Sequence, residues 1–274
     1  MTVNPARHGP FPGRLAPDAI AAYAAATGDD TALVLAGHAV PAIFPVILDF
    51  TPVEAARADL PSDVWQRTRG GVHGEHDIVL HRPLLPDETL HTWAQISAVR
   101  TTWSGTQVAV YLEQVDAGGR LAVEQWWTMV LLGLDGLPDL GSMPARHRFQ
   151  DGVRDQPIGL AVAHIDEQMP HRYAEVSGDW SDHHFDIGAA RAAGFDFVFA
   201  HGLCTMAVCT HRLLRVLGVD DPGRVSRVAV RFASPTPIGC DLTVNAYRSE
   251  HSIAFEAAAG GTTTITNGRL ELRT

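Results

Sequence analysis

Cysteines and long apolar runs are scarce in this sequence. Its three cysteines, Cys204, Cys209 and Cys240, are too few and too scattered for a disulfide framework or a zinc site, so we expect free thiols. The sequence contains no run of about 18 apolar residues, the length that a membrane span needs. The segment MTVNPARHGPFPGRLAP at the start has no apolar core of signal-peptide length. We therefore expect a soluble, cytoplasmic protein without membrane insertion.

Basic runs and phosphate-binding loops are also lacking. The formal net charge is −10, and the 21 basic residues, all arginine, form no basic run, which argues against nucleic-acid binding. No P-loop or dinucleotide fingerprint occurs, so no cofactor is expected. The composition is globular, with 46% hydrophobic and 19% charged residues. The 274 residues suffice for one large domain or for two of roughly 130 residues.

The sequence repeats itself at an offset of 150 residues. YAAATGD at 23–29 and YAEVSGD at 173–179 are identical at four of seven positions. HRPLLPDETLHTWA at 81–94 resembles FASPTPIGCDLTVNA at 232–246, with an offset of 152. Two matches at nearly one offset predict two copies of one folding unit.

The expected units are residues 1–135 and 153–274, joined by a linker at 136–152 that is rich in glycine, proline and charge. Each unit is expected to have a short helix, a longer helix and several antiparallel strands. In the second unit, PHRYAEVSGD predicts the short helix, HGLCTMAVCTHRLLRVLG the long one, and SRVAVRFASP a strand with alternating apolar residues.

Three segments of the first unit predict consecutive antiparallel strands: TLHTWAQISAV, TQVAVYLEQVD and LAVEQWWTMVLLGL. AGG at 117–119 supplies a hairpin turn between the last two, and Trp126 and Trp127 are expected to face opposite sides of their strand. A helix against an antiparallel sheet, made twice, predicts the α+β class.

GDWSDHHFDIGAARAAGFDFVFAHGLCTMAV at 178–208 resembles the signature of the MaoC-like hydratases, and in particular that of the type 2 enoyl-CoA hydratases, approximately GDxNPLHxDPxxAxxAGFxxPIxHGLCT. VRFASPTPIGCDL at 230–242 resembles the strand and turn that follow in this family. GGVHGEHDIVLHRPL at 70–84 resembles the non-catalytic half of two-copy members. The resemblance implies a double hot-dog fold, in which two tandem units each wrap a long helix in an antiparallel sheet.

By this resemblance, Asp179 and His184 are the catalytic pair, and the main-chain N–H of Gly202 is the oxyanion donor. These residue types suit the chemistry, because an acid–base pair can hold a water and exchange its protons, while a helix N-terminus can face an oxyanion. The first copy keeps Asp29 but has Val34 where the histidine would stand. We therefore expect one active site, in the second unit, with the first unit shaping the pocket.

Other residues are expected to support this pair. Ser181 stands where the family has an asparagine, and Thr210, where members often have serine, is a candidate to hydrogen-bond the pair. His201 is expected to anchor the loop before the long helix. Arg227 and Arg231, near the pocket strand, are candidates to bind the CoA diphosphate.

Asp182 belongs to the Ser-Asp-His segment that replaces the family's Asn-Pro-Leu. If its carboxylate pointed inward, the like charge would raise the pKa of Asp179. No metal site is expected, because the spacing of the acids and histidines in 182–186 enforces no ligand geometry.

The resemblance implies a hydro-lyase that hydrates trans-2-enoyl thioesters of CoA and dehydrates (R)-3-hydroxyacyl thioesters. Two alternatives stay open. One is a pathway-specific dehydratase or cyclase acting on a carrier-bound, polyketide-like intermediate. The other is a non-enzymatic partner subunit, against which the intact Asp, His and Gly argue. The expected partners are an acyl-CoA or acyl-carrier thioester and a second copy of the chain in a homodimer.

Overall fold

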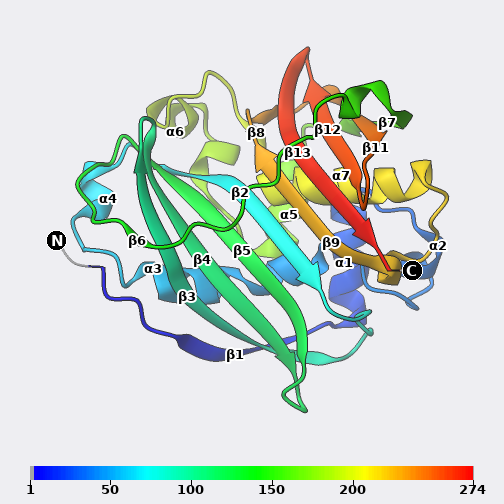
Figure 1. Ribbon diagram of the computed structural model, residues 1–274, viewed down its shortest axis with the longest axis horizontal. Helices are drawn as coiled ribbons and strands as arrows, with labels where there is room; N and C mark the ends of the chain where they lie inside the picture. The colour runs from blue at the N-terminus through cyan, green and yellow to red at the C-terminus, as the bar shows by residue number, and fades with distance from the viewer. Residues whose placement is uncertain (1–2, 274) are drawn as a thin grey trace.

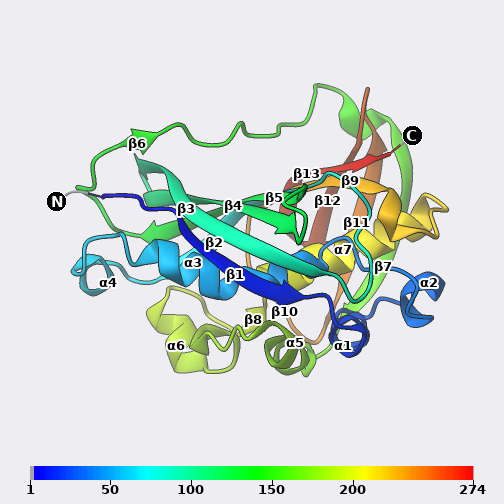
Figure 2. The same cartoon turned by 90° about the horizontal axis from the view of Figure 1, so that it is seen from below.

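A continuous antiparallel sheet forms one layer of the molecule, and the helices cover one of its faces (Figure 1; Figure 2). The computed structural model describes residues 3–273, within which the strands follow the order β1-β3-β4-β5-β2-β9-β13-β12-β11-β7, with β6 beside β3. The first five of these positions come from the N-terminal half of the chain and the last five from the C-terminal half. This arrangement confirms the predicted α+β class.

The strands of the N-terminal half are β1 (His8–Arg14), β2 (Gly71–Leu80), β3 (Thr89–Thr102), β4 (Gly105–Asp116) and β5 (Leu121–Leu132). Those of the C-terminal half are β7 (Pro157–Ile165), β9 (Val225–Phe232), β11 (Cys240–Arg248), β12 (Ile253–Ala259) and β13 (Thr262–Leu272). The short strands are β6 (Leu140–Gly141) and the separate pair β8 (Phe199–Ala200) and β10 (Thr236–Pro237).

The helices of the N-terminal half are α1 (Pro17–Thr27), α2 (Ala32–Leu35), α3 (Phe50–Arg57) and α4 (Val64–Arg67). Those of the C-terminal half are α5 (Met169–Ser177), α6 (Ile187–Ala192) and α7 (Gly202–Val216). Short 3-10 helices lie at Phe44–Leu48, Val153–Asp155, Asp182–His184 and Pro222–Arg224.

The two halves join where β2 pairs with β9 in the middle of the sheet. Ile78 lies opposite Val228 in this antiparallel register. On the face away from the helices, Arg227 donates from Nε to Oδ1 of Asp77 at 2.9 Å. The two halves therefore share one hydrogen-bonded sheet, and the helices of both halves cover the same face of it.

The repeated sequence motif folds in the same way in both halves. α1 and α5 pack against each other, and each ends at a left-handed glycine, Gly28 with φ 65° and Gly178 with φ 77°. Glycine adopts this conformation at little steric cost, which is why it ends helices so often. An aspartate follows each glycine, so the motif places Asp29 and Asp179 at equivalent helix ends.

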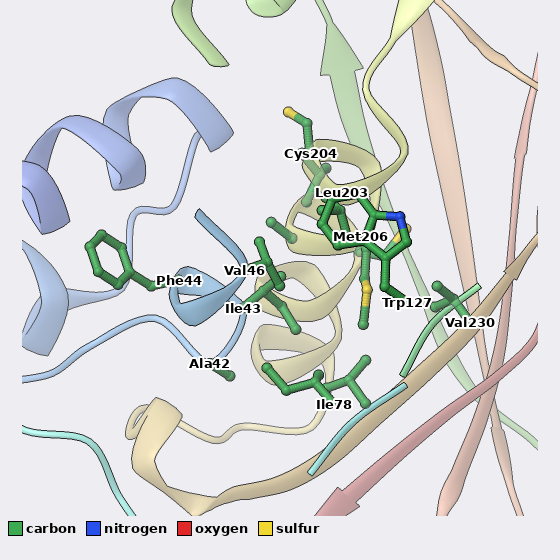
Figure 3. Close-up of a cluster of buried hydrophobic side chains, with 14 of the residues drawn as sticks. Ala42, Ile43, Phe44, Val46, Ile78, Trp127, Leu203, Cys204, Met206 and Val230 are labelled. Carbon is green, nitrogen blue, oxygen red and sulfur yellow. The ribbon is translucent and has the colours of Figure 1, made fainter. Parts of the chain in front are cut away.

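α7 is the long helix predicted from HGLCTMAVCTHRLLRVLG, and it runs through the core. Figure 3 shows side chains of α7, among them Leu203 and Met206, in a cluster with Ile43 and Val46 of the N-terminal half. Fully burying such a side chain stabilises the fold by about 1.5–3 kcal/mol. The core is therefore shared by the two halves, and α7 is held from both sides.

The N-terminal half departs from the prediction of a long helix in each unit. Besides α1, α2 and α4, this half has the 3-10 helix Phe44–Leu48 followed by α3, which has only eight residues. Pro45 and Pro52 each stand near the start of one of these pieces. A single helix through both would place Pro52 in its interior, where proline removes a hydrogen bond and clashes with the preceding turn.

The predicted strands of the N-terminal half are confirmed as β3, β4 and β5, with Gly119 in the turn at φ 76°. Trp126 and Trp127 face opposite sides of β5, as expected, since Trp126 borders a small cavity on the outer face and Trp127 lies in the core. The linker at 136–152 crosses this outer face, as Figure 2 shows, and Arg146 pairs there with Glu75 at 3.1 Å. The domain boundaries themselves stay a prediction.

All three cysteines are free, and Cys204 and Cys209 are buried. Among residues 3–273, no helix has the length and apolar character needed to cross a membrane.

Candidate active site

A cavity of about 300 Å³ lies between the two halves. From the N-terminal half, α3, the start of β2 and residues of β5 form its wall. From the C-terminal half, the loop at 179–184, β8, the first turn of α7 and the segment 232–236 complete it. The predicted residues Asp179, His184 and Gly202 all line this cavity, so the structure brings the expected catalytic residues together.

The carboxylate of Asp179 is fixed by a tight turn. Its Oδ1 accepts hydrogen bonds from the main-chain N–H of Ser181 at 3.1 Å and from the Ser181 hydroxyl at 2.6 Å. Hydrogen bonds to an ionised carboxylate are about twice as strong as neutral ones. Ser181 therefore orients Asp179 directly, although its side chain is shorter than the asparagine of the family pattern.

His184 is held in one tautomer. Its Nδ1 donates to the main-chain carbonyl of Phe199 at 2.8 Å, so Nε2 carries the lone pair of the neutral ring. Only 6% of the residue is exposed. Burial, with smaller contributions from His201 and His183, lowers the pKa of His184 to about 2. The ring is therefore neutral near pH 7, and its Nε2 is a hydrogen-bond acceptor.

His201 contacts both Asp179 and His184. Its Nε2 donates to the main-chain carbonyl of Asp179 at 3.0 Å, and its ring lies against that of His184 with 3.7 Å between centroids. Its Nδ1 is buried without a hydrogen-bond partner among the described residues. Through these contacts His201 anchors the loop at 179–184 and the His184 ring.

Donor atoms of Asp179, His184 and His201 lie within 4.8 Å of one another. This is the set of described residues that could hold a metal ion, and it differs from the 182–186 segment considered from the sequence. Because the same atoms also suit a shared water molecule, the grouping by itself does not require a metal.

Gly202 begins α7, at a point where a side chain would be crowded. A Cβ added there would lie 3.2 Å from the ring of Phe232. The first N–H groups of a helix have no acceptor within the helix and carry partial positive charge. Gly202 thus brings an N–H donor to the cavity wall without a side chain in the way.

The structure does not bring Thr210, Arg227 or Arg231 to the cavity. The Thr210 hydroxyl donates to the Met206 carbonyl of its own helix at 2.8 Å. Arg227 pairs with Asp77 on the outer face, and Arg231 borders the small cavity of about 50 Å³ beneath the linker. Neither arginine lies among the residues that line the large cavity.

Asp182 is exposed at the start of the 3-10 helix Asp182–His184 and does not line the cavity. The inward-pointing carboxylate considered from the sequence is therefore not found.

Nine residues of the N-terminal half line the cavity, and none of them was named for it from the sequence; Arg57, His73 and Trp127 are among them. The His73 ring stacks on Trp127 with 4.4 Å between centroids and lies 5.0 Å from Phe232. Burial lowers the pKa of His73 well below its ordinary value. The segment GGVHGEHDIVLHRPL was the available signal for His73, because it carries the family resemblance in the N-terminal half.

Comparisons with known proteins agree with this fold. Residues 150–268 match the model of the MaoC-like domain, a stretch that begins in the linker and ends in β13. The chain contains a MaoC-like domain. Asp179, His184 and Gly202 all lie within it. The resemblance read from the sequence is thus confirmed.

Relatives of known name match over part of their length. The chain is 29% identical over 184 residues to 3-hydroxyacyl-thioester dehydratase Y of Mycobacterium tuberculosis, covering 65% of this chain and 62% of that protein. It is 28% identical over 189 residues to peroxisomal multifunctional enzyme type 2 of Drosophila melanogaster, covering 67% of this chain and 31% of that protein. The chain thus spans less than two thirds of either relative.

Solved structures match over nearly the whole chain. A MaoC-like dehydratase from Phytophthora capsici has a TM-score of 0.85 at 22% identity, covering 99% of this chain and 96% of that one. A Mycobacterium tuberculosis protein described as having a double hotdog fold has a TM-score of 0.63 at 13% identity, covering 98% and 95%. The predicted double hot-dog fold is thereby confirmed.

Proposed function

We propose that the protein is a hydro-lyase that hydrates trans-2-enoyl thioesters and dehydrates (R)-3-hydroxyacyl thioesters at the Asp179–His184 pair. One observation carries the proposal: a neutral imidazole with a free Nε2 and a carboxylate face the same cavity as a helix N-terminus. The names of the two partial relatives, a 3-hydroxyacyl-thioester dehydratase and a peroxisomal multifunctional enzyme, support this reaction class.

In the hydration direction, a water molecule donates its two O–H groups to Asp179 and to Nε2 of His184. Its lone pair then faces C3 of the enoyl thioester. As the C3–O bond forms, one acceptor takes a proton from the water, and the electrons of the double bond move onto the thioester oxygen as an enolate. The Gly202 N–H stabilises that oxygen, and C2 finally receives the proton. Dehydration is the reverse sequence.

The pair needs its supporting contacts to stay in place. General acid–base groups contribute about 10²–10⁴-fold to a rate, provided that their geometry is held. The Phe199 carbonyl fixes the His184 tautomer, and Ser181 fixes the Asp179 carboxylate. Both contacts come from main chain or from a near neighbour, which keeps the site rigid before substrate binds.

An assay of crotonyl-CoA hydration, monitored as the loss of the conjugated thioester absorbance, tests the proposal. We expect turnover to (R)-3-hydroxybutyryl-CoA, established by chiral analysis of the product. An (S) product or no turnover with either the CoA or the acyl-carrier thioester would contradict it. Turnover of the carrier thioester alone would instead favour the carrier-bound alternative.

A further inference from the structure

The cavity contains one arginine among the described residues that line it, and that arginine comes from the N-terminal half. Arg57 is the last residue of α3 and lines the cavity together with the loop at 179–184. Arginine stays charged in proteins, and although burial lowers the pKa of Arg57 from its ordinary value, the guanidinium remains a cation near pH 7. Burial lowers the pKa of the four histidines that line the cavity, so they are neutral near pH 7: His73, His183, His184 and His201.

Arg57 is only partly neutralised by its neighbour. It forms an ion pair with Glu54 one turn earlier in α3, but the side chain of Glu54 is 61% exposed while that of Arg57 is 28% exposed. The Nε of Arg57 is buried and has no hydrogen-bond partner in the described part of the chain. Its guanidinium carbon lies 4.2 Å from the centroid of the Trp65 ring, which holds the side chain in place. Arg57 is thus a cation held in place by Trp65, and its Nε–H donor has no acceptor among the described residues.

A buried N–H without an acceptor is destabilising, and this destabilisation is removed when a ligand supplies the acceptor. Carboxylates and phosphates both match the fork of N–H groups on arginine, and of these two a short acyl group can carry the carboxylate. Burial lowers the pKa of Arg57, and the charges of Glu54 and, to a smaller extent, Asp179 partly offset this, so Arg57 and Asp179 lie near each other in the same cavity. An anionic group bound at Arg57 would therefore lie near the reacting carbons.

We infer that the protein favours short acyl thioesters that carry a carboxylate on the acyl group, and that Arg57 is the residue that recognises it. This inference rests on the proposed function, since it names the substrate class of the same site. The thioester end lies toward Gly202, and the acyl carboxylate accepts hydrogen bonds from Arg57. The catalytic loop supplies the chemistry, and α3 of the N-terminal half supplies the selectivity.

Binding of two saturated thioesters tests the inference without any turnover. Butyryl-CoA and succinyl-CoA differ at the end of the acyl chain, where a methyl group is replaced by a carboxylate. We expect calorimetry to show succinyl-CoA binding at least about tenfold more tightly, a difference of about 1.4 kcal/mol. Arg57→Gln should abolish that preference, and Arg57→Lys should keep part of it. Arg100→Gln, which removes an exposed arginine paired with Asp139, should bind both ligands as the unaltered protein does.

Glu54→Gln gives a second, opposite readout, because it removes the carboxylate that competes for Arg57. We expect it to tighten succinyl-CoA binding severalfold relative to butyryl-CoA. Equal binding of the two ligands by the unaltered protein, or a preference that survives in Arg57→Gln, would overturn the inference. Thermal unfolding of each variant shows whether it is folded.

Turnover of crotonyl-CoA and of fumaryl-CoA, its analogue with a terminal carboxylate, separates this inference from the proposed function. Faster hydration of fumaryl-CoA, measured as kcat/KM, with the ratio falling at least about tenfold in Arg57→Gln, is the expected result. Hydration of crotonyl-CoA with no advantage for fumaryl-CoA would overturn the inference alone. A binding preference without hydration of either compound would leave the anion site standing and overturn the proposed function.

Discussion

The helix-end turn of the N-terminal half and that of the C-terminal half are nearly the same structure. In the N-terminal half, Oδ1 of Asp29 accepts from the main-chain N–H of Thr31 at 3.0 Å and from its hydroxyl at 2.6 Å. In the C-terminal half, Asp179 accepts the same two bonds from Ser181 at 3.1 and 2.6 Å. The turn is therefore a structural feature of both halves, and an aspartate in it is not by itself a sign of catalysis.

The halves differ in what surrounds the turn. Val34 of α2 is buried in apolar surroundings, whereas His184 occupies the corresponding place five residues after its aspartate and lines the cavity. Asp29 is itself buried, with 6% of its surface exposed, while Asp179 is partly exposed to the cavity. The comparison teaches that Asp179 combines a structural duty, shared with Asp29, with the proposed catalytic one.

Replacing His184 has the largest expected effect, because it makes the C-terminal turn resemble the N-terminal one. His184→Asn can still donate to the Phe199 carbonyl but has no lone-pair nitrogen for the water. We expect kcat to fall about 10²–10⁴-fold in steady-state assays. His184→Val copies Val34 and should lose as much activity with some loss of stability. A folded His184→Asn protein with near-normal turnover would remove His184 from the mechanism.

Acid should destabilise the fold through histidines in both halves. Burial lowers the pKa of several of them in the folded state: His73, His76, His184, His201 and His211. Below about pH 6.5 the unfolded chain binds protons that the folded chain does not. The contribution of these histidines to the free energy of unfolding is therefore complete above that pH and decreases as the pH falls below it towards the folded-state pKa values. Each such histidine contributes a slope of up to about 1.4 kcal/mol per pH unit.

Burial raises the pKa of Asp49, so the folded chain holds a proton on this residue that the unfolded chain releases. Asp49 therefore has the opposite effect on the pH dependence of stability, but it offsets the effect of only one histidine proton. Calorimetric melting temperatures should therefore fall steadily from pH 7 to pH 5. His76→Gln, which removes a histidine bonded to Gln125, should reduce the slope by about one proton. A melting temperature that stays constant over this range would contradict the neutral state assigned to these rings.

Ser181→Ala has an intermediate expected effect. It removes the hydroxyl bond to Asp179 and leaves the main-chain N–H bond in place. A hydrogen bond to a charged group contributes about 1.5–3 kcal/mol, so we expect kcat/KM to fall about tenfold to a hundredfold. Thr31→Ala is the matched change in the other half and should alter stability without altering kcat. Equal kinetic losses in the two variants would argue that the turn acts only through the fold.

Asp182→Asn should have the smallest effect. Its exposed carboxylate is screened by solvent, and surface charges of this kind contribute about 0–1 kcal/mol. We expect kcat/KM to change less than about threefold. A change of the size caused by Ser181→Ala would show that Asp182 turns toward the cavity when substrate is bound.

Much of the fold follows from local sequence pattern. The predicted α7, the strands β3 to β5 and the glycine-terminated α1 and α5 are all present, because their periodicity and end signals act over a few residues. The break before α3 could also have been expected, since Pro52 is tolerated in the first turn of a helix but not in its interior. Alternation along β9 places Val228 and Val230 toward the core, which turns Arg227 and Arg231 to the outer face.

The rest of the site depends on contacts between distant segments. The residues of the signature lie within about 25 positions of one another, so their motif was enough to bring Asp179, His184 and Gly202 together. Arg57 and His73 reach the same cavity only because β2 pairs with β9 and α3 packs beneath the shared sheet. No local pattern in the sequence specifies that placement.

Paired measurement of Asp179→Asn and Asp29→Asn tests the central claim, that the C-terminal half alone carries the chemistry, most directly. An asparagine oxygen can still accept the turn bonds in both variants, so both should fold. We predict that kcat/KM for enoyl-thioester hydration falls about 10²–10⁴-fold in Asp179→Asn and changes less than about twofold in Asp29→Asn. Similar losses in the two variants, or none in Asp179→Asn, would contradict the claim.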